Sequence, residues 1–117
     1  MTKAICLAEK LSTFSDHWSP KIVAQFNEND VMLVKVKGEF VWHSHPETDD
    51  FFLVLKGHLD IQLRDGEVRL GPGDLCVVPK GVEHRPVAED EAHLLLIEPR
   101  DTPNTGNVAT AAVKHAI

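Results

Sequence analysis

From Ile22 onward, the sequence alternates short apolar runs with Gly, Pro and Asp residues. Leu59, Ile61 and Leu63 alternate with polar side chains, which is the two-residue period of a strand with one buried face. Short strands separated by frequent turns favour an antiparallel sandwich or barrel, so we predict an all-β fold. The runs that we interpret as strands are residues 31–38, 39–43, 51–57, 58–63, 67–70, 74–79 and 93–99.

The remaining segments complete one predicted domain, residues 1–117, with a barrel core over about residues 22–99. Asp65-Gly66 favours a hairpin turn, because this pair readily adopts the positive φ angles that two-residue turns need. Apolar residues at helical spacing in 4–14 predict a short N-terminal helix. We expect residues 100–117 to form a tail that runs over the surface or packs on a partner.

Composition excludes several classes of function. Twelve basic and eighteen acidic residues give a net charge of −6, which argues against binding to nucleic acid or to anionic membranes. No apolar run approaches the roughly 20 residues of a membrane span, and two cysteines cannot form a framework of several disulfides. We therefore expect a cytoplasmic protein. The chain has no tyrosine, so no mechanism can use a phenol as acid or base.

The most informative short motif is His43-Ser44-His45. On a strand, residues i and i+2 face the same side with Cα atoms roughly 6.5–7 Å apart, so two imidazoles can converge on one metal ion. Asp49 or Asp50 would add a carboxylate, and His84 could complete the site. The alternative is that the two histidines of the motif are ordinary surface residues.

The longer pattern resembles the two motifs of the cupin superfamily. The first motif matches Gly38, His43-x-His45, Asp50 and Gly57, and the second matches Gly73, Pro79-x-Gly81 and His84. The resemblance implies a small, single-domain cupin with a double-stranded β-helix barrel of the jelly-roll type. It also implies a metal site that opens into the barrel mouth. The apolar residues near the first motif are most simply core or dimer surface, and of those that line the pocket we expect Trp42, next to His43, to form a wall.

Carried over by position, the family's metal ligands are His43, His45, Asp50 and His84. The carboxylate position usually holds Glu, so Asp50 is one methylene shorter, and a site of three histidines remains open as an alternative. Motif spacing favours Asp50 over Asp49. Imidazole and carboxylate ligands suit a divalent transition metal ion (Fe, Mn, Ni, Co or Zn), among which the sequence does not choose.

The resemblance suggests a metal-binding cupin that acts on or binds a small polar metabolite, with a dioxygenase or an isomerase as candidate activities. The alternative is a non-catalytic cupin that binds or senses a small molecule. Epimerases and thiol dioxygenases of this fold that depend on a tyrosine are disfavoured, because the chain has none. Cupins commonly pair through exposed sheet edges, so we expect a homodimer.

Overall fold

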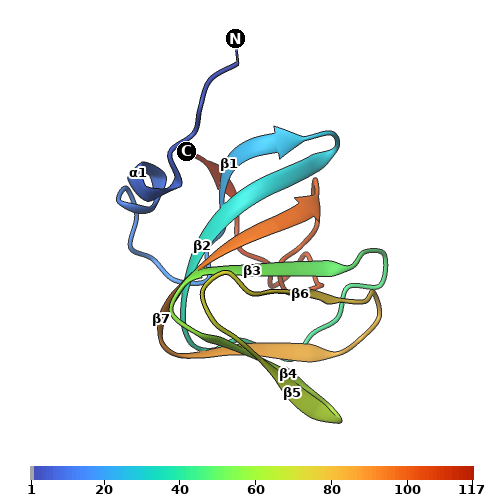
Figure 1. Ribbon diagram of the computed structural model, residues 1–117. Coiled ribbons are helices and arrows are strands. Elements are labelled where there is room, and N and C mark those ends of the chain that lie inside the picture. Colours follow the sequence, from blue (N-terminus) through green and yellow to red (C-terminus); the bar gives the residue numbers. More distant parts are fainter. Residues whose placement is uncertain (1) are drawn as a thin grey trace.

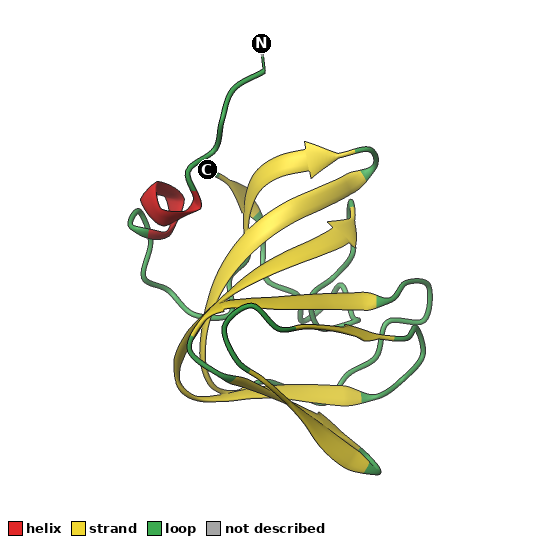
Figure 2. Ribbon diagram, viewed as in Figure 1, coloured by secondary structure: helices red, strands yellow, loops and turns green. Residues whose placement is uncertain are grey.

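The computed structural model describes residues 2–117 and confirms the all-β class (Figure 2). One five-residue helix, α1 (Leu7–Leu11), precedes the strands. The strands are β1 (Lys21–Phe26), β2 (Asn29–Glu39), β3 (Asp50–Lys56), β4 (Leu59–Leu63), β5 (Gly66–Leu70), β6 (Leu75–Val78), β7 (His84–Pro99) and β8 (His115–Ala116). Within residues 2–117, no helix has the length and apolar character needed to cross a membrane.

Strand β7 organises the barrel because it pairs with three other strands. It runs antiparallel to β2 along most of its length. On its other side, its first residues pair with β4 and its later residues pair with β3. Figure 1 shows β2 and β7 curving together from the β4–β5 hairpin towards β1. The two long strands therefore connect all parts of the barrel.

A bulge accounts for the curvature of these two strands. Val36 pairs with Ala92 and Gly38 pairs with Ala88, so residues 89–91 of β7 lie opposite a single residue of β2. Extra residues in one strand bend it and increase its twist. Gly38 has a φ of 83°, a conformation that glycine adopts without the steric cost of a side chain. The bend closes the sheet around its apolar face.

Alternate residues of the long strands fill the core. The inward positions in the middle of β2 and β7 are apolar, and side chains from β3 and β4 complete the packing. Burial of each such side chain contributes about 1.5–3 kcal/mol relative to exposure. The buried core residues on these four strands are Met32, Val34, Val36, Phe52, Val54, Leu59, Ile61, Ala88, Ala92, Leu94 and Leu96.

Some predicted boundaries were wrong. Strand β7 begins at His84 rather than at residue 93, because Pro86 and the acidic residues 89–91 interrupt the local pattern while cross-strand pairing with β4 and β2 continues. Residues 40–43, predicted as strand, lie after the end of β2. Strands β1 and β8 were not predicted, and the helix predicted within 4–14 is only five residues long.

Candidate metal centre

Four side chains that are distant in the sequence converge at one end of the barrel. His43 and His45 lie in the connection between β2 and β3, Asp50 begins β3 and His84 begins β7. Each offers one nitrogen or oxygen atom, and these four atoms all lie within 4.8 Å of one another. All four residues are buried, with exposed fractions between 1% and 8%. We call these four residues the His3Asp cluster.

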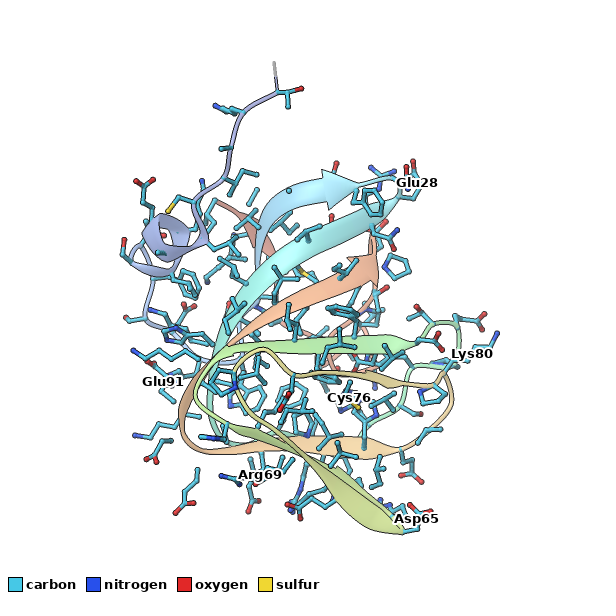
Figure 3. The ribbon with its side chains drawn as sticks, viewed as in Figure 1. Glu28, Asp65, Arg69, Cys76, Lys80 and Glu91 are labelled. Carbon is cyan, nitrogen blue, oxygen red and sulfur yellow. The ribbon has the colours of Figure 1, made fainter. Side chains whose placement is uncertain are left out.

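Backbone hydrogen bonds bring the two connections together. The amide of His43 donates to the carbonyl oxygen of His84 at 3.0 Å, and the amide of His84 donates to the carbonyl oxygen of His43 at 2.9 Å. The amide of Gly81 donates to the carbonyl oxygen of His45 at 2.9 Å. Figure 3 shows that Lys80, in the β6–β7 connection, lies at the opposite end of the barrel from Glu91. The cluster therefore forms where the β2–β3 and β6–β7 connections meet.

Backbone carbonyl groups also orient two of the imidazoles. Nδ1 of His43 donates to the carbonyl oxygen of Val41, and Nδ1 of His84 donates to that of Val82, each at 2.9 Å. A hydrogen bond from one ring nitrogen fixes the tautomer, so the lone pair is on the other nitrogen. In both residues the free Nε2 atom is the one directed into the cluster. This arrangement presents two nitrogen lone pairs to a common point.

The carboxylate of Asp50 lies at the centre of the three rings. Its Oδ2 atom is 2.7 Å from Nε2 of His84, 3.2 Å from Nε2 of His45 and 3.8 Å from Nε2 of His43. A carboxylate oxygen and an imidazole lone pair approach this closely only when a proton or a metal ion lies between them. Nε2 of His45 is buried and makes no hydrogen bond within residues 2–117, so one donor atom of the cluster lacks a partner.

Charge pairing shifts two pKa values in opposite directions. Burial by itself raises the pKa of Asp50, but its close contacts with the three imidazoles outweigh burial and hold the pKa well below its usual range. Burial by itself lowers the pKa of His45, but the Asp50 carboxylate outweighs it and raises the pKa. The cluster therefore binds positive charge strongly.

The donor set identifies the kind of ion that fits. Imidazole nitrogens with one carboxylate oxygen are typical ligands of divalent transition metals, at nitrogen–metal distances of about 2.0–2.1 Å. Four atoms within 4.8 Å of one another, one of them an unpartnered buried nitrogen, are consistent with such an ion. An ion held by these four donors would have room for further coordination by water or a small molecule.

The structure brings together all four residues that the sequence predicted. It also selects between the two aspartates, because Oδ1 of exposed Asp49 accepts a hydrogen bond from the amide of Lys80 instead of joining the cluster. The reasoning from strand geometry was wrong, however. His43 and His45 lie in an irregular connection, and only His43 forms an isolated bridge, so backbone pairing with His84 orients the motif.

A cavity of about 40 Å³ lies beside the cluster and is lined by His43 and Asp50. Apolar side chains of β2, β3 and β7 form most of its walls. Trp18 and Phe40, whose rings stack 4.7 Å apart, line it as well. The expectation that Trp42 forms a wall was wrong, because its ring packs under the guanidinium group of Arg64, 3.8 Å from the ring centre.

The sequence reasoning missed two further residues of this cavity. Glu98, at the end of β7, is 2% exposed and lines the cavity. It follows Leu94 and Leu96 at two-residue spacing, and this alternation could have identified a carboxyl group on the buried face. Asn104 reaches the cavity from the tail, where its Oδ1 accepts a hydrogen bond from the amide of Ala112. No signal in the sequence pointed to Asn104.

The tail covers this end of the barrel. Gly106 lies close to the backbone of Ser44, the residue between the two histidines of the motif. The approach is so close that a Cβ atom at residue 106 would clash with the carbonyl oxygen of Ser44. A second pocket of about 410 Å³ lies between the β2–β3 connection and the segment after β7, and His45 lines it. Residues 100–106 therefore form part of the surroundings of the cluster.

Comparisons with known proteins agree with this architecture. A crystal structure of a cupin-2 domain containing protein from Shewanella frigidimarina NCIMB 400 has a TM-score of 0.81 and 48% identity, over 82% of this chain and 94% of that chain. Protein NMB1881 from Neisseria meningitidis has a TM-score of 0.75 and 32% identity, over 83% and 99% of the two chains.

Among curated proteins, the uncharacterized protein YdbB of Bacillus subtilis (strain 168) is 39% identical over 64 residues. The match spans 54% of this chain and only 57% of YdbB. The family model described as "Cupin domain" matches residues 30–98, which include the whole His3Asp cluster. The chain belongs to the cupin family and has the jelly-roll fold of its structural relatives.

Proposed function

We propose that the chain is a metal-dependent cupin in which His43, His45, Asp50 and His84 hold one divalent transition metal ion. The observation that carries this proposal is the convergence of four buried donor atoms from three parts of the chain. Buried polar atoms are nearly always hydrogen-bonded, yet Nε2 of His45 has no such partner within residues 2–117. A metal ion would satisfy this atom together with the other three.

The proposed ligand is a small polar molecule that binds beside the ion. A bound divalent ion supplies Lewis-acid polarisation of a ligand oxygen or a site for dioxygen, so the candidate activities are those of a dioxygenase or an isomerase. The protein's own contribution is to orient the imidazoles through the carbonyl groups of Val41 and Val82 and to shield the ligand from water with the rings of Trp18 and Phe40.

Elemental analysis tests the metal site directly. Protein produced with Fe, Mn, Co, Ni and Zn supplied should retain close to one equivalent of metal per chain. His45→Ala should lose this metal while keeping its fold, because the replaced Nε2 atom makes no hydrogen bond. His93→Ala is the matched control, since His93 contacts Glu91 at 3.3 Å and is not part of the cluster. Wild-type protein without stoichiometric metal would refute the proposal.

Turnover distinguishes the two classes of function that the site allows. The metal-loaded protein would be incubated with whatever small molecule co-purifies with it, and both would then be examined by mass spectrometry. A chemically changed molecule supports an enzyme. A molecule that is returned unchanged supports the non-catalytic alternative, a cupin that binds or senses a small molecule.

A further inference from the structure

Three titratable residues of the described chain line the cavity: His43, Asp50 and Glu98. Of these, Glu98 is not a ligand in the proposed metal site. Its carboxyl group lies on the buried face of β7, and it borders the same cavity as His43 and Asp50. Within residues 2–117, burial and longer-range charges are what act on the pKa of this carboxyl group, and no hydrogen bond is among these influences. A buried carboxyl group without a partner costs stability, so its presence calls for an explanation.

Other buried polar residues show the contrast. Asp30, which lies opposite Glu98 on β2, accepts a hydrogen bond from Nε2 of Gln25 at 3.1 Å. The ammonium group of Lys21 donates to Asp16 at 2.8 Å. These buried charged groups have partners in the chain, whereas the Glu98 carboxyl faces a cavity. The missing partner of Glu98 is therefore expected to come from a molecule inside the cavity.

The charged groups around Glu98 come from four elements. Asp30 on β2 and Asp50 on β3 repel a negative charge at this position, whereas Lys114 in the tail and His45 in the β2–β3 connection attract one. Burial is the largest influence, and together these effects raise the pKa of Glu98 to about 7. Glu98 can therefore be either a hydrogen-bond donor or an anion near neutral pH.

The cavity walls restrict what can bind there. A volume of about 40 Å³ accommodates a few atoms, such as one end of a larger molecule. Two carboxyl groups, those of Asp50 and Glu98, border this space, and among residues 2–117 no lysine or arginine lines it. Arg85, the cation next to His84 in the sequence, is occupied by Glu39 and Gln62. This environment favours an uncharged, oxygen-bearing group over an anion.

We propose that Glu98 is a ligand-recognition residue that makes a hydrogen bond with a hydroxyl or carbonyl group of an uncharged ligand in the cavity. This inference rests on the proposed metal site, because the ligand would bind between Glu98 and the His3Asp cluster. A protonated Glu98 donates a hydrogen bond to the ligand oxygen, and an ionised Glu98 accepts one from a ligand hydroxyl, with no covalent bond formed or broken. An anionic ligand would be repelled whenever Glu98 is ionised.

The test uses Co²⁺-loaded protein, with 1,2-propanediol as the neutral probe and lactate, which is similar in size, as the anionic probe. Binding is followed by the visible spectrum of Co²⁺ at pH 6 and at pH 8. At pH 8, lactate should bind Glu98→Gln about tenfold more tightly than wild type, because only wild type can carry a negative charge at residue 98. The affinity for propanediol should fall in Glu98→Leu at both pH values, because leucine cannot hydrogen-bond.

The variants also separate recognition from structure. Glu98→Leu matches the apolar wall and serves as the second variant if Glu98→Gln does not fold. Both variants should bind Co²⁺ and be at least as stable as wild type, because each removes a buried ionisable group. Glu91→Gln is the matched control, since Glu91 is exposed on the same strand at the opposite end of the barrel (Figure 3). It should bind both probes as wild type does.

The two proposals fail in different ways. If wild type does not bind Co²⁺, the metal site is wrong, and the inference about Glu98 falls with it. If all variants bind Co²⁺ and bind lactate and propanediol with the affinities of wild type at both pH values, the metal site stands and the role of Glu98 is refuted. A Glu98 variant that folds but is clearly less stable than wild type would show a structural role and would also overturn the inference.

Discussion

Replacement of Asp50 by asparagine tests how strongly the His3Asp cluster depends on its one negative charge. The side chains have nearly the same shape, so the change removes charge without opening a cavity. In the metal-free protein, Asp50→Asn loses the 2.7 Å contact with His84 and the attraction to His45. A hydrogen bond to a charged group contributes about 1.5–3 kcal/mol. We expect the free energy of unfolding to fall by about 2 kcal/mol near pH 7.

The pH dependence gives this prediction a definite sign. The pKa of Asp50 is lower in the folded than in the unfolded protein, so its ionised form stabilises the fold above the unfolded pKa, which is about 4. This contribution is lost as the pH falls from there towards the lower folded pKa. The difference between wild type and Asp50→Asn should therefore shrink below pH 4, by about 1.4 kcal/mol per pH unit.

Urea denaturation of chelator-treated protein between pH 3 and pH 7 measures this difference. Asp49→Asn is the control, because Asp49 is exposed and only accepts a hydrogen bond from the amide of Lys80. In a second series, metal added at a free concentration of 100 times its Kd should stabilise wild type by about 2.7 kcal/mol. The same metal concentration should stabilise Asp50→Asn by less. The reasoning is refuted if Asp50→Asn and Asp49→Asn behave alike, or if the difference stays constant down to pH 3.

Three further predictions follow from other contacts. Asp50 raises the pKa of His45, so the metal-free wild type should lose stability relative to His45→Gln as the pH rises from about 6.5 through the raised pKa. Urea denaturation measures the difference in free energy of unfolding, and a difference that does not change with pH would contradict the prediction. Gly106→Ala places a Cβ atom against the backbone of Ser44 and gives alanine a φ of +76°, so the free energy of unfolding should fall by about 1–2 kcal/mol. Hydrogen exchange in residues 100–114 should become faster, and unchanged exchange would show that the tail does not pack against Ser44 in solution. The homodimer expected from the sequence stays a prediction. Among the strands of residues 2–117, β6 pairs only with β3, and Leu75 and Val77 on β6 are exposed. Light scattering after size-exclusion chromatography would contradict a homodimer if it detected only monomers at micromolar concentration.

Local sequence patterns were sufficient to predict the all-β class and the members of the cluster. Alternation of apolar and polar residues reports which face of a strand is buried, and this pattern held for Leu59 and Ile61. The spacing of the two motifs was enough to predict that His43, His45 and His84 belong to one site. These features are readable because side-chain type and spacing are properties of short segments.

Features that depend on pairing between distant segments could not be read in this way. The local pattern in residues 85–92 does not indicate a strand, yet β4 and β2 supply hydrogen-bonding partners that extend β7 back to His84. Likewise, His43 and His45 are oriented by backbone bonds to the β6–β7 connection and not by strand alternation. A propensity acts over a few residues, whereas these bonds join segments about 40 residues apart.

The sequence by itself determined which residue types are available at this site and their order along the chain. Motif spacing already favoured Asp50 over Asp49, but only the tertiary structure placed the Asp50 carboxylate against the imidazoles and the buried Glu98 carboxyl beside them. The physical reason is that burial and charge interactions depend on distances through space. Such distances exist only after the bend in β2 and β7 has closed the barrel.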